Sequence, residues 1–349
     1  METMKAVAAM GDGTIQIVEV PRVTYGPYEC LVRVTACGLC NGTDLKIIAK
    51  GKVAQQDIMY PNLIGHEAIG VIEEVGEKVK NLKKGDRIVC PICTFEPPGY
   101  HSNWGGMNGY GITHDIVAMI EDGVAQTDPM VANTSPDDYL GKPIPKDMSD
   151  PDAVMLLTLK ENYSALLNFG VGEETDLLIY GDGPVGLGLA SFAKLLGAKS
   201  VVVVGLLEDR LARIQKLGHA DIIINSTKQN VSEILGDRRF DVMIDAVGLI
   251  EVALEGAQYL RSGGLVGCYG VLEEKYANIN LLALPNNTRV QILNWPVGEH
   301  RTHDAVVKLV QEGKVDPKWF YSHVMSIDDA QKGLEMIRSK EAFKVIFTM

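Results

Sequence analysis

The amino-acid sequence predicts an α/β protein of two domains, in which a β-rich domain is followed by a doubly wound parallel sheet. Three observations support this prediction. The chain has 349 residues, which exceeds what one hydrophobic core usually supports. Its first third reads as short strands separated by Gly, Pro and Asp turns. From Pro151 onward, apolar strands alternate with amphipathic helices, as in a parallel sheet covered on both faces.

In the first part of the chain, short apolar segments end at turn-forming residues. This spacing is typical of a barrel-like β domain. The predicted strands are residues 4–8, 30–35, 68–76 and 86–90.

In the second part, a helix is predicted to begin near Asp150, because Pro151 is favourable in a first helical turn. The predicted strands that follow are 176–180, 200–204, 222–224, 240–246 and 264–270, and the predicted helices between them are 185–196 and 208–217. The tail reads as helices 303–311 and 327–337 and a strand 343–347, and we expect it to return to the first domain.

Bulk properties exclude several classes of function. The formal net charge of -12 argues against nucleic acid or an anionic membrane surface as the main partner. No apolar run has the length needed to span a bilayer, and the N-terminus lacks the pattern of a signal peptide. Six cysteines are too few for a disulfide scaffold in a chain of this length. We therefore expect a soluble cytoplasmic protein.

The strongest local pattern is a glycine-rich turn that follows an apolar strand. Residues 177–186 read Leu-Leu-Ile-Tyr-Gly-Asp-Gly-Pro-Val-Gly, which contains G-x-G-x-x-G with a helix behind it. The first glycine permits a tight turn, the second lets a pyrophosphate approach the backbone, and the third allows close packing of helix and strand. Free N–H groups at the helix N-terminus attract phosphate. The pattern predicts a Rossmann unit with cofactor contacts at Gly181, Gly183, Pro184, Val185 and Gly186.

The second strand of this unit ends without the carboxylate that binds the adenosine ribose in NAD enzymes. Val204 is followed by Gly205, and Glu208 lies three residues further on. Without that acid, the repulsion that excludes a 2′-phosphate is absent, and Arg210 offers a positive charge. We therefore expect NADP to be modestly favoured over NAD, with use of both cofactors left open.

Two segments of the first domain contain residue types that bind metals. One runs from Cys37 to Asp44 as C-G-L-C-N-G-T-D, and the other is Gly65-His66-Glu67. Thiolate, imidazole and carboxylate are ligands of catalytic zinc, which keeps one position open for the substrate. A lone cysteine or histidine more often serves packing, so the order of the motifs along the chain is the more informative observation.

That order is Gly-Leu-Cys, Thr-Asp, Gly-His-Glu, Gly-Asp-Arg and then the glycine-rich unit. It resembles the zinc-containing alcohol and polyol dehydrogenases of the medium-chain dehydrogenase/reductase superfamily, and the resemblance covers nearly the whole chain. It implies a GroES-like catalytic domain at residues 1–152, a Rossmann domain for NAD or NADP at 153–294, and a return to the catalytic domain at 295–349.

The resemblance also implies roles for single residues. Cys40 and His66 match the first two ligands of the catalytic zinc, and Glu67 matches the adjacent acid that lies near the metal or binds it. Thr43 matches the hydroxyl residue that passes the alcohol proton towards solvent, although one extra residue before it departs from the family pattern. Further cofactor contacts are implied at Val247, Gly248 and Gly270.

The third zinc ligand of the family is replaced. Leu157 falls on its position, and leucine cannot bind zinc. Three alternatives stay open: Glu67 completes the site with water, Glu161 reaches it, or the metal is weakly held or absent. We favour Glu67.

The structural zinc of many relatives needs four closely spaced cysteines, whereas only Cys90 and Cys93 occur here, so we expect that metal to be missing. The loop 101–110 stands in place of that zinc lobe. Its Trp104 and its amide side chains suit a hydroxylated substrate, and a loop that merely packs is the alternative.

These observations predict NAD(P)-dependent interconversion of a secondary alcohol and a ketone, or of an alcohol and an aldehyde, in a small polyol- or sugar-like substrate. Two alternatives remain: a zinc-free quinone or enone reductase, and a homologue that binds the dinucleotide without turnover. A homodimer or homotetramer is expected, joined through a sheet edge formed by Ile279–Leu284 and Val290–Leu293.

Overall fold

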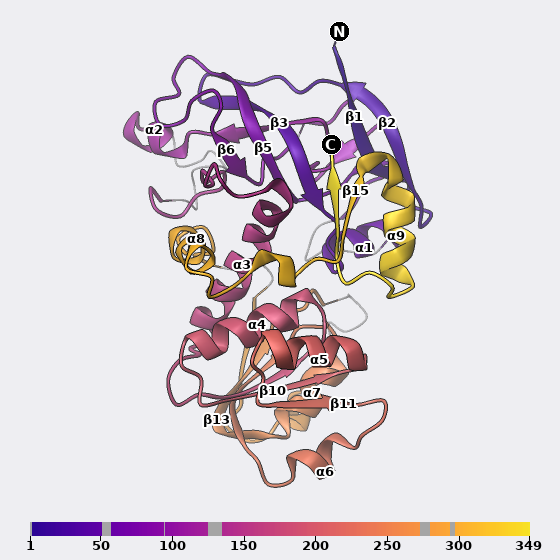
Figure 1. The fold of residues 1–349 in the computed structure, drawn as a ribbon, viewed down its shortest axis with the longest axis vertical. Coiled ribbons are helices and arrows are strands. Elements are labelled where there is room, and N and C mark those ends of the chain that lie inside the picture. Colours follow the sequence, from indigo (N-terminus) through magenta and orange to yellow (C-terminus); the bar gives the residue numbers. More distant parts are fainter. Residues whose placement is uncertain (1, 51–56, 94, 125–134, 273–279, 294–296) are drawn as a thin grey trace. The chain divides into compact units, whose positions relative to one another are not determined.

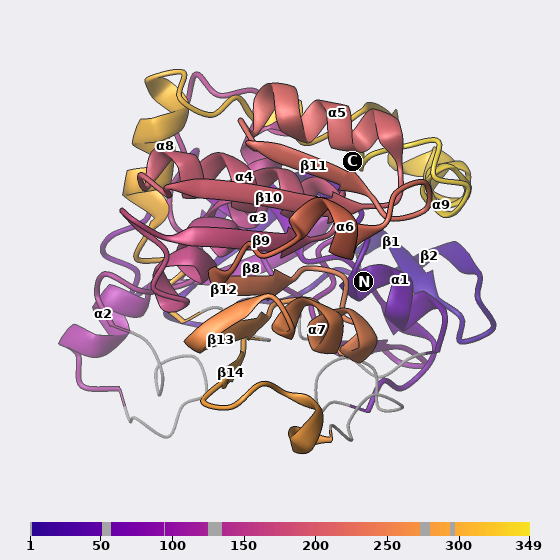
Figure 2. The same cartoon turned by 90° about the horizontal axis from the view of Figure 1, so that it is seen from below.

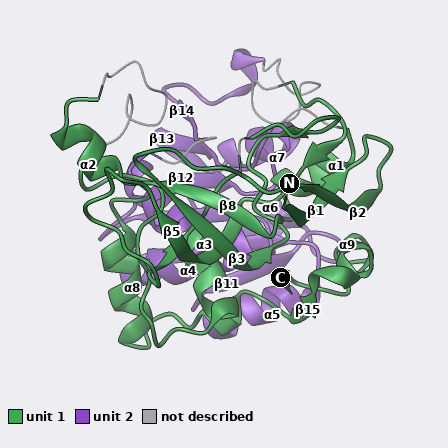
Figure 3. Cartoon of the chain, turned by 90° about the horizontal axis from the view of Figure 1, so that it is seen from above, with its two compact units in different colours: residues 1–51, 57–157, 300–349 green, residues 52–56, 158–299 purple. Residues whose placement is uncertain are grey.

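The computed structural model describes residues 2–50, 57–93, 95–124, 135–272, 280–293 and 297–349. The chain forms two compact units (Figure 3). It passes from the first unit to the second between Leu157 and Thr158, and it returns between Glu299 and His300. The predicted domain boundary between residues 294 and 295 lies outside the described residues.

The first unit is built mainly from strands, as the sequence predicts (Figure 1). One sheet has the order β2-β1-β4-β7, and a second has the order β15-β16-β3-β5-β6, with β8 also paired to β3. The strands are β1 (Thr3–Ala9), β2 (Ile15–Pro21), β3 (Glu29–Gly38), β4 (Asn62–Leu63), β5 (Glu67–Val75), β6 (Arg87–Val89), β7 (His101–Ser102), β8 (Tyr110–His114), β15 (His323–Ser326) and β16 (Val345–Thr348).

Helices α1 (Thr43–Ile48), α2 (Ile116–Glu121), α8 (His303–Gln311) and α9 (Ala330–Arg338) belong to the same unit. The long helix α3 (Asp150–Asn168) begins in the first unit and ends in the second. The Arg87 guanidinium fixes its start, since it donates to the carbonyl oxygens of Pro145 and Met148 and forms an ion pair with Asp150.

The second unit contains a six-stranded parallel sheet with the order β11-β10-β9-β12-β13-β14. Counted along the chain, this order is 3-2-1-4-5-6, the arrangement of dinucleotide-binding folds. Helices α4 and α5 pack on one face, and α6 and α7 on the other (Figure 2). The elements are β9 (Asp176–Tyr180), α4 (Pro184–Leu195), β10 (Ser200–Gly205), α5 (Glu208–Leu217), β11 (Ile222–Asn225), α6 (Val231–Leu235), β12 (Phe240–Asp245), α7 (Ile250–Ala257), β13 (Leu260–Cys268) and β14 (Arg289–Ile292).

The burial of its strands on both faces explains why this sheet could be predicted from the sequence. Residues 201–204 of β10 are all valine and all buried, as expected for a strand covered on both faces. Helix α5 is polar outside and buries Leu211 and Ile214, and its bounds match the predicted helix 208–217. The predicted α/β class with a doubly wound parallel sheet is confirmed.

Among the elements whose bounds differ from prediction, β13 and α9 do so for local reasons. Strand β13 begins at Leu260 and not at Gly264, because an irregularity around Gly263, whose φ is +82°, interrupts the register without ending the strand. Helix α9 begins at Ala330, because residues 327–329 form a 3₁₀ turn capped by the Ser326 side chain.

The start of α2 depends on one buried carboxylate, Asp115, which is 2% exposed. It accepts hydrogen bonds from the backbone N–H groups of Lys80, Asn81 and Ala118, and from the amide side chain of Asn81. Burial raises the pKa of Asp115, but the N–H donors lower it more, so the net pKa lies below its usual value.

We expect Asp115→Ala to reduce the free energy of unfolding by about 3 kcal/mol at neutral pH, because three backbone N–H groups lose the buried carboxylate that accepts from them. The folded-state pKa of Asp115 lies below that of the unfolded chain, so this stabilisation is present above the unfolded pKa and is lost as the pH falls through the folded pKa. Urea unfolding at neutral pH and below about pH 4 measures both effects. The exposed Asp237→Ala is the matched control; equal stability of the two variants at neutral pH would contradict the assignment.

None of the helices in the described part of the chain is long and apolar enough to cross a membrane.

Candidate active site

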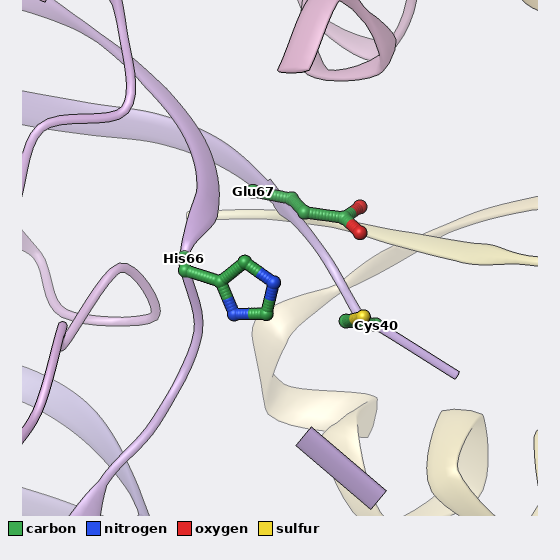
Figure 4. A group of neighbouring side chains, drawn as sticks. All are labelled: Cys40, His66 and Glu67. Atoms are coloured by element: carbon green, nitrogen blue, oxygen red, sulfur yellow. The ribbon is translucent and has the colours of Figure 1, made fainter. Parts of the chain in front are cut away.

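Three residues with metal-binding side chains meet where β3 ends and β5 begins. Glu67 opens β5 and pairs in register with Gly38 at the end of antiparallel β3. Cys40 follows Gly38 by two residues, and His66 precedes Glu67, so strand pairing brings the two sequence segments together. One ligand atom of each side chain, the Cys40 thiol, an imidazole nitrogen and a carboxylate oxygen, lies within 4.8 Å of the others (Figure 4).

The imidazole of His66 faces a second acid, Asp44, in helix α1. His66 Nδ1 lies 3.4 Å from Oδ1 of Asp44, which is fully buried. The other oxygen of Asp44 accepts the backbone N–H of Cys40 at 2.9 Å. A proton on Nδ1 facing this carboxylate leaves Nε2 as the ligand atom, the arrangement that orients histidine ligands of metals.

Electrostatics around His66 favour positive charge. Burial disfavours the imidazolium ion, but the Asp44 carboxylate and then the Cys40 thiol favour it more, so the pKa of His66 lies well above its usual value. A bound cation would use the same negative surroundings, and it would displace the proton because a ligand histidine is neutral.

The carboxylate of Glu67 forms a buried ion pair with Lys344. Oxygen Oε2 faces the ammonium group, and both side chains are almost inaccessible to solvent. Burial lowers the pKa of Lys344, but the nearby Glu67 carboxylate raises it more, and the net shift is upward. Lys344 immediately precedes β16, which pairs with β3, and this pairing brings the lysine from the end of the chain to the cluster.

Thr43 and Trp104 lie beside this cluster. The backbone N–H of Thr43 donates to the Cys40 thiol at 3.4 Å, so Thr43 lies beside the candidate ligand. The ring of Trp104 lies 5.6 Å from the His66 ring, centroid to centroid. The Trp104 loop is anchored by the N–H of Gly106, which donates to Gly65, and by that of Cys93, which donates to Trp104. Loop 101–110 therefore borders the candidate metal ligands.

Three other residues considered from sequence, Leu157, Cys90 and Cys93, are buried. Leu157 is buried in α3. Cys90 follows β6 and its thiol donates to the His66 carbonyl at 2.9 Å, while Cys93 is fully buried. The donor set Cys40, His66 and Glu67 fits zinc, which accepts thiolate, imidazole and carboxylate and tolerates one open position.

The glycine-rich loop has the geometry that its sequence predicts. Gly181 has a φ of +134°, and its N–H donates to the carbonyl of Val204. Gly183 caps α4, with Pro184 at the first helical position, and no atom lies within 4 Å of where a side chain would begin. A Cβ on Gly186 would overlap the carbonyl of Gly181, so close packing requires glycine there. Val185 follows Pro184 in the first turn of α4.

The other predicted cofactor contacts lie at neighbouring strand ends of the same sheet. Gly205 ends β10, and Arg210 is the third residue of α5. Val247 and Gly248 follow β12, and Gly270 packs directly against Gly248.

Four acidic or basic residues with structural roles in these sites were missed or given no firm role from sequence. Asp245 is fully buried and accepts the N–H groups of residues 247–249, which fixes the loop after β12. Asp182 contacts the turn after β10, and Lys344 and Asp44 contact candidate ligands. Asp182 stood inside the glycine motif, but Lys344 carries no local signal because its partner is 277 residues away (344 minus 67).

Comparison with known proteins matches both halves of the chain to families. The family described as "Alcohol dehydrogenase GroES-like domain" matches residues 26–129, and "Zinc-binding dehydrogenase" matches residues 184–312. Together these segments cover more than half of the chain.

Several complete proteins are also similar. L-idonate 5-dehydrogenase of Vitis vinifera is 29% identical over 360 residues, covering 100% of this chain and 95% of that protein. Sorbitol dehydrogenase of Arabidopsis thaliana is 26% identical, covering 100% of this chain and 96% of that protein. Among solved structures, alcohol dehydrogenase TADH from Thermus sp. ATN1 has the same fold, with a TM-score of 0.78 at 24% identity, over 99% of this chain and 100% of that one.

Proposed function

Because the chain belongs to the zinc-type medium-chain alcohol and polyol dehydrogenases, we propose that it interconverts a secondary alcohol and a ketone, or an alcohol and an aldehyde, in a small polyol- or sugar-like substrate. Family membership makes it an oxidoreductase that uses a nicotinamide cofactor and zinc. The observation that carries the proposal is the convergence of Cys40, His66 and Glu67 at the β3–β5 junction.

In this proposal Cys40, His66 and Glu67 hold the metal. When bound, zinc would polarise the substrate oxygen and the nicotinamide would carry the hydride. Asp44 faces Nδ1 of His66 at 3.4 Å and orients the ring by its charge, and its second oxygen fixes the backbone of Cys40. Glu67 keeps one oxygen for the metal while the other faces Lys344. With Leu157 buried and unable to coordinate, the fourth position is left to water or substrate.

Two residues are assigned to the substrate and its proton. Thr43 passes the alcohol proton towards solvent, which its position beside Cys40 supports. Trp104 covers one side of the His66 ring, where an indole can pack on the apolar face of a sugar or polyol and exclude water. The names of the relatives, which include L-idonate and sorbitol dehydrogenases, support the same substrate class.

The second unit supplies the dinucleotide site. We assign the pyrophosphate to the backbone at Gly181, Gly183 and Gly186, and to the N-terminus of α4 at Pro184 and Val185. Val247, Gly248 and Gly270 border the next strand ends and complete the cofactor contacts. The sequence favours NADP for two reasons: Gly205 leaves the end of β10 without its own carboxylate, and Arg210 offers a positive charge. In the folded chain the carboxylate of Asp182 lies beside Gly205, which removes the first of these reasons.

We divide the functional domains as the sequence does, with a catalytic domain at residues 1–152 and 295–349 and a cofactor domain at 153–294. Cytoplasmic location is part of the same proposal, and six free cysteines fit a reducing compartment.

A zinc-free quinone or enone reductase would not need three converging metal ligands. A homologue that binds the dinucleotide without turnover would not need an acid that orients the histidine among them. Both alternatives are tested together with the proposal.

Purified protein is incubated with polyols, sugar acids and small secondary alcohols, with NAD and NADP in parallel, and reduced nicotinamide is followed by absorbance. We expect zinc-dependent reduction with at least one polyol-like substrate. Cofactor binding without turnover on this panel, or turnover of enones without metal, would overturn the proposal.

We further propose a homo-oligomer joined through the edge strand β14. Among the described residues this strand lies at the edge of the parallel sheet, and Val290 and Ile292 are exposed there. The preceding turn exposes Leu281 and Leu282, the latter 94% accessible. Ile279, the first residue of the predicted edge, lies outside the described residues.

We expect Ile292→Lys to convert the oligomer into a monomer, because like charges would meet at the edge of the two sheets and apolar contact would be lost. Light scattering after size-exclusion chromatography measures the mass. Leu195→Lys, an exposed leucine on α4, is the matched control. A monomeric wild type, or an oligomer that persists in Ile292→Lys, would contradict this interface.

A further inference from the structure

The turn between β10 and α5 is the part of a dinucleotide-binding sheet that reads the adenosine ribose. An acid at this strand end binds the 2′-hydroxyl of NAD, whereas a nearby arginine accommodates the 2′-phosphate of NADP. In this chain the strand ends in Gly205, so its own side chain contributes nothing to that choice.

Asp182 supplies a carboxylate to this turn from the neighbouring glycine-rich loop. Its oxygen Oδ2 accepts the backbone N–H groups of both Leu206 and Leu207 at 2.7 Å. These are the first two residues after β10, and Leu207 precedes the first residue of α5. Two hydrogen bonds from backbone N–H groups to one charged oxygen hold the side chain in this place.

The absence of a side chain at Gly205 leaves room for Asp182. A Cβ at position 205 would lie 2.6 Å from Cβ and 2.9 Å from Oδ2 of Asp182, closer than side-chain atoms approach one another. The lack of a side chain at position 205 therefore goes together with the presence of Asp182. The adjacent loop supplies the carboxylate that the strand end itself lacks.

Arg210 in the first turn of α5 brings one positive charge to this region, and the acids beside it outnumber that charge. The first turn of α5 adds two more acids, Glu208 and Asp209. The nearby Lys228 is paired with Glu208 at 2.5 Å. A 2′-phosphate, with up to two negative charges, would enter beside the Asp182 carboxylate and would find the two N–H groups already occupied.

We propose that Asp182 makes the cofactor site selective for NAD, because its carboxylate holds the two N–H groups at the end of β10 and repels a 2′-phosphate. This inference rests on the proposed role of the second unit as the nicotinamide site. It reverses the cofactor preference that Gly205 and Arg210 together predict from the sequence.

The test measures binding without turnover. Wild-type protein, Asp182→Asn, Asp182→Ala and the control Asp209→Asn are titrated by calorimetry with ADP-ribose and with its 2′-phosphorylated form. These probes contain the adenosine half of NAD and NADP and need no metal or substrate. Circular dichroism and thermal melting verify that each variant folds.

We expect wild type to bind ADP-ribose about a hundredfold more tightly than the 2′-phosphorylated form. Asp182→Asn removes the charge, and Asp182→Ala also frees the two N–H groups, so each should reduce that ratio at least about tenfold, chiefly by improving binding of the phosphorylated form. Asp209→Asn removes one charge but no contact with the two N–H groups, so it should change the ratio much less than either Asp182 variant. Equal binding of the two forms by wild type, or the same ratio in the Asp182 variants, would overturn the role of Asp182 while leaving the cofactor site intact. Binding of neither form would overturn the proposed function as well.

Discussion

Replacing Cys40 by Ala is expected to remove the bound zinc and to lower kcat/KM about a thousandfold, which corresponds to about 4 kcal/mol of transition-state stabilisation. The thiol supplies one of three ligand atoms that lie within 4.8 Å of one another. Among the described residues of this cluster, His66 and Glu67 then remain as two donors, too few to retain zinc. Metal content by atomic absorption and steady-state kinetics measure the two effects.

Cys37→Ala is the matched control for this experiment. Cys37 lies in β3 three residues before Cys40, and it is fully buried but contributes to no ligand group among the described residues. Its loss removes a packing contact and should cost stability while leaving zinc content unchanged. Full turnover and full metal content in Cys40→Ala would contradict the ligand assignment, and equal loss of zinc in both variants would attribute the effect to folding.

Lys344→Met is expected to lower the free energy of unfolding of the metal-free protein by about 4 kcal/mol, because it leaves the buried Glu67 carboxylate without its cation. A carboxylate that is 4% exposed has little water to replace the lost partner. Zinc should restore part of the stability, since the freed carboxylate gains a cation from the metal. Urea unfolding with and without zinc measures both parts.

The double variant Glu67→Gln/Lys344→Met removes both charges and should be more stable than Lys344→Met alone when metal is absent. The exposed Lys332→Met on α9 controls for the loss of a lysine as such. If Lys344→Met unfolds at the same urea concentration as Lys332→Met, the buried ion pair does not have the strength that its burial implies.

The cofactor unit was predictable because its signals are local. Its strands are continuous apolar runs, and its glycine motif requires strand, turn and helix in immediate succession. The irregularity in β13 was not predictable, since Gly263 resembles a turn that ends one strand and begins another, and only pairing with β12 shows that the strand continues.

The candidate metal site was only partly predictable, because its residues stand in local motifs but meet through the pairing of distant strands. Cys40 and the pair His66-Glu67 stand in recognisable segments, but their approach depends on the register between Gly38 and Glu67. The contact between Lys344 and Glu67 could not be predicted from the sequence, because it depends on β16 returning from the end of the chain to pair with β3. The direction of the Asp182 side chain was also not predictable. The sequence shows that Gly205 lacks a carboxylate, but only the fold shows that Asp182 supplies one from the glycine-rich loop.

The most direct test of the zinc dehydrogenase assignment is the metal dependence of turnover in the wild-type protein. The protein is stripped with a chelator, titrated with zinc and assayed with a substrate identified in the polyol panel. We predict that activity is lost on stripping and returns in proportion to zinc, reaching its maximum at one zinc bound per chain at the Cys40, His66 and Glu67 site. Full activity in protein that contains no zinc would contradict the account.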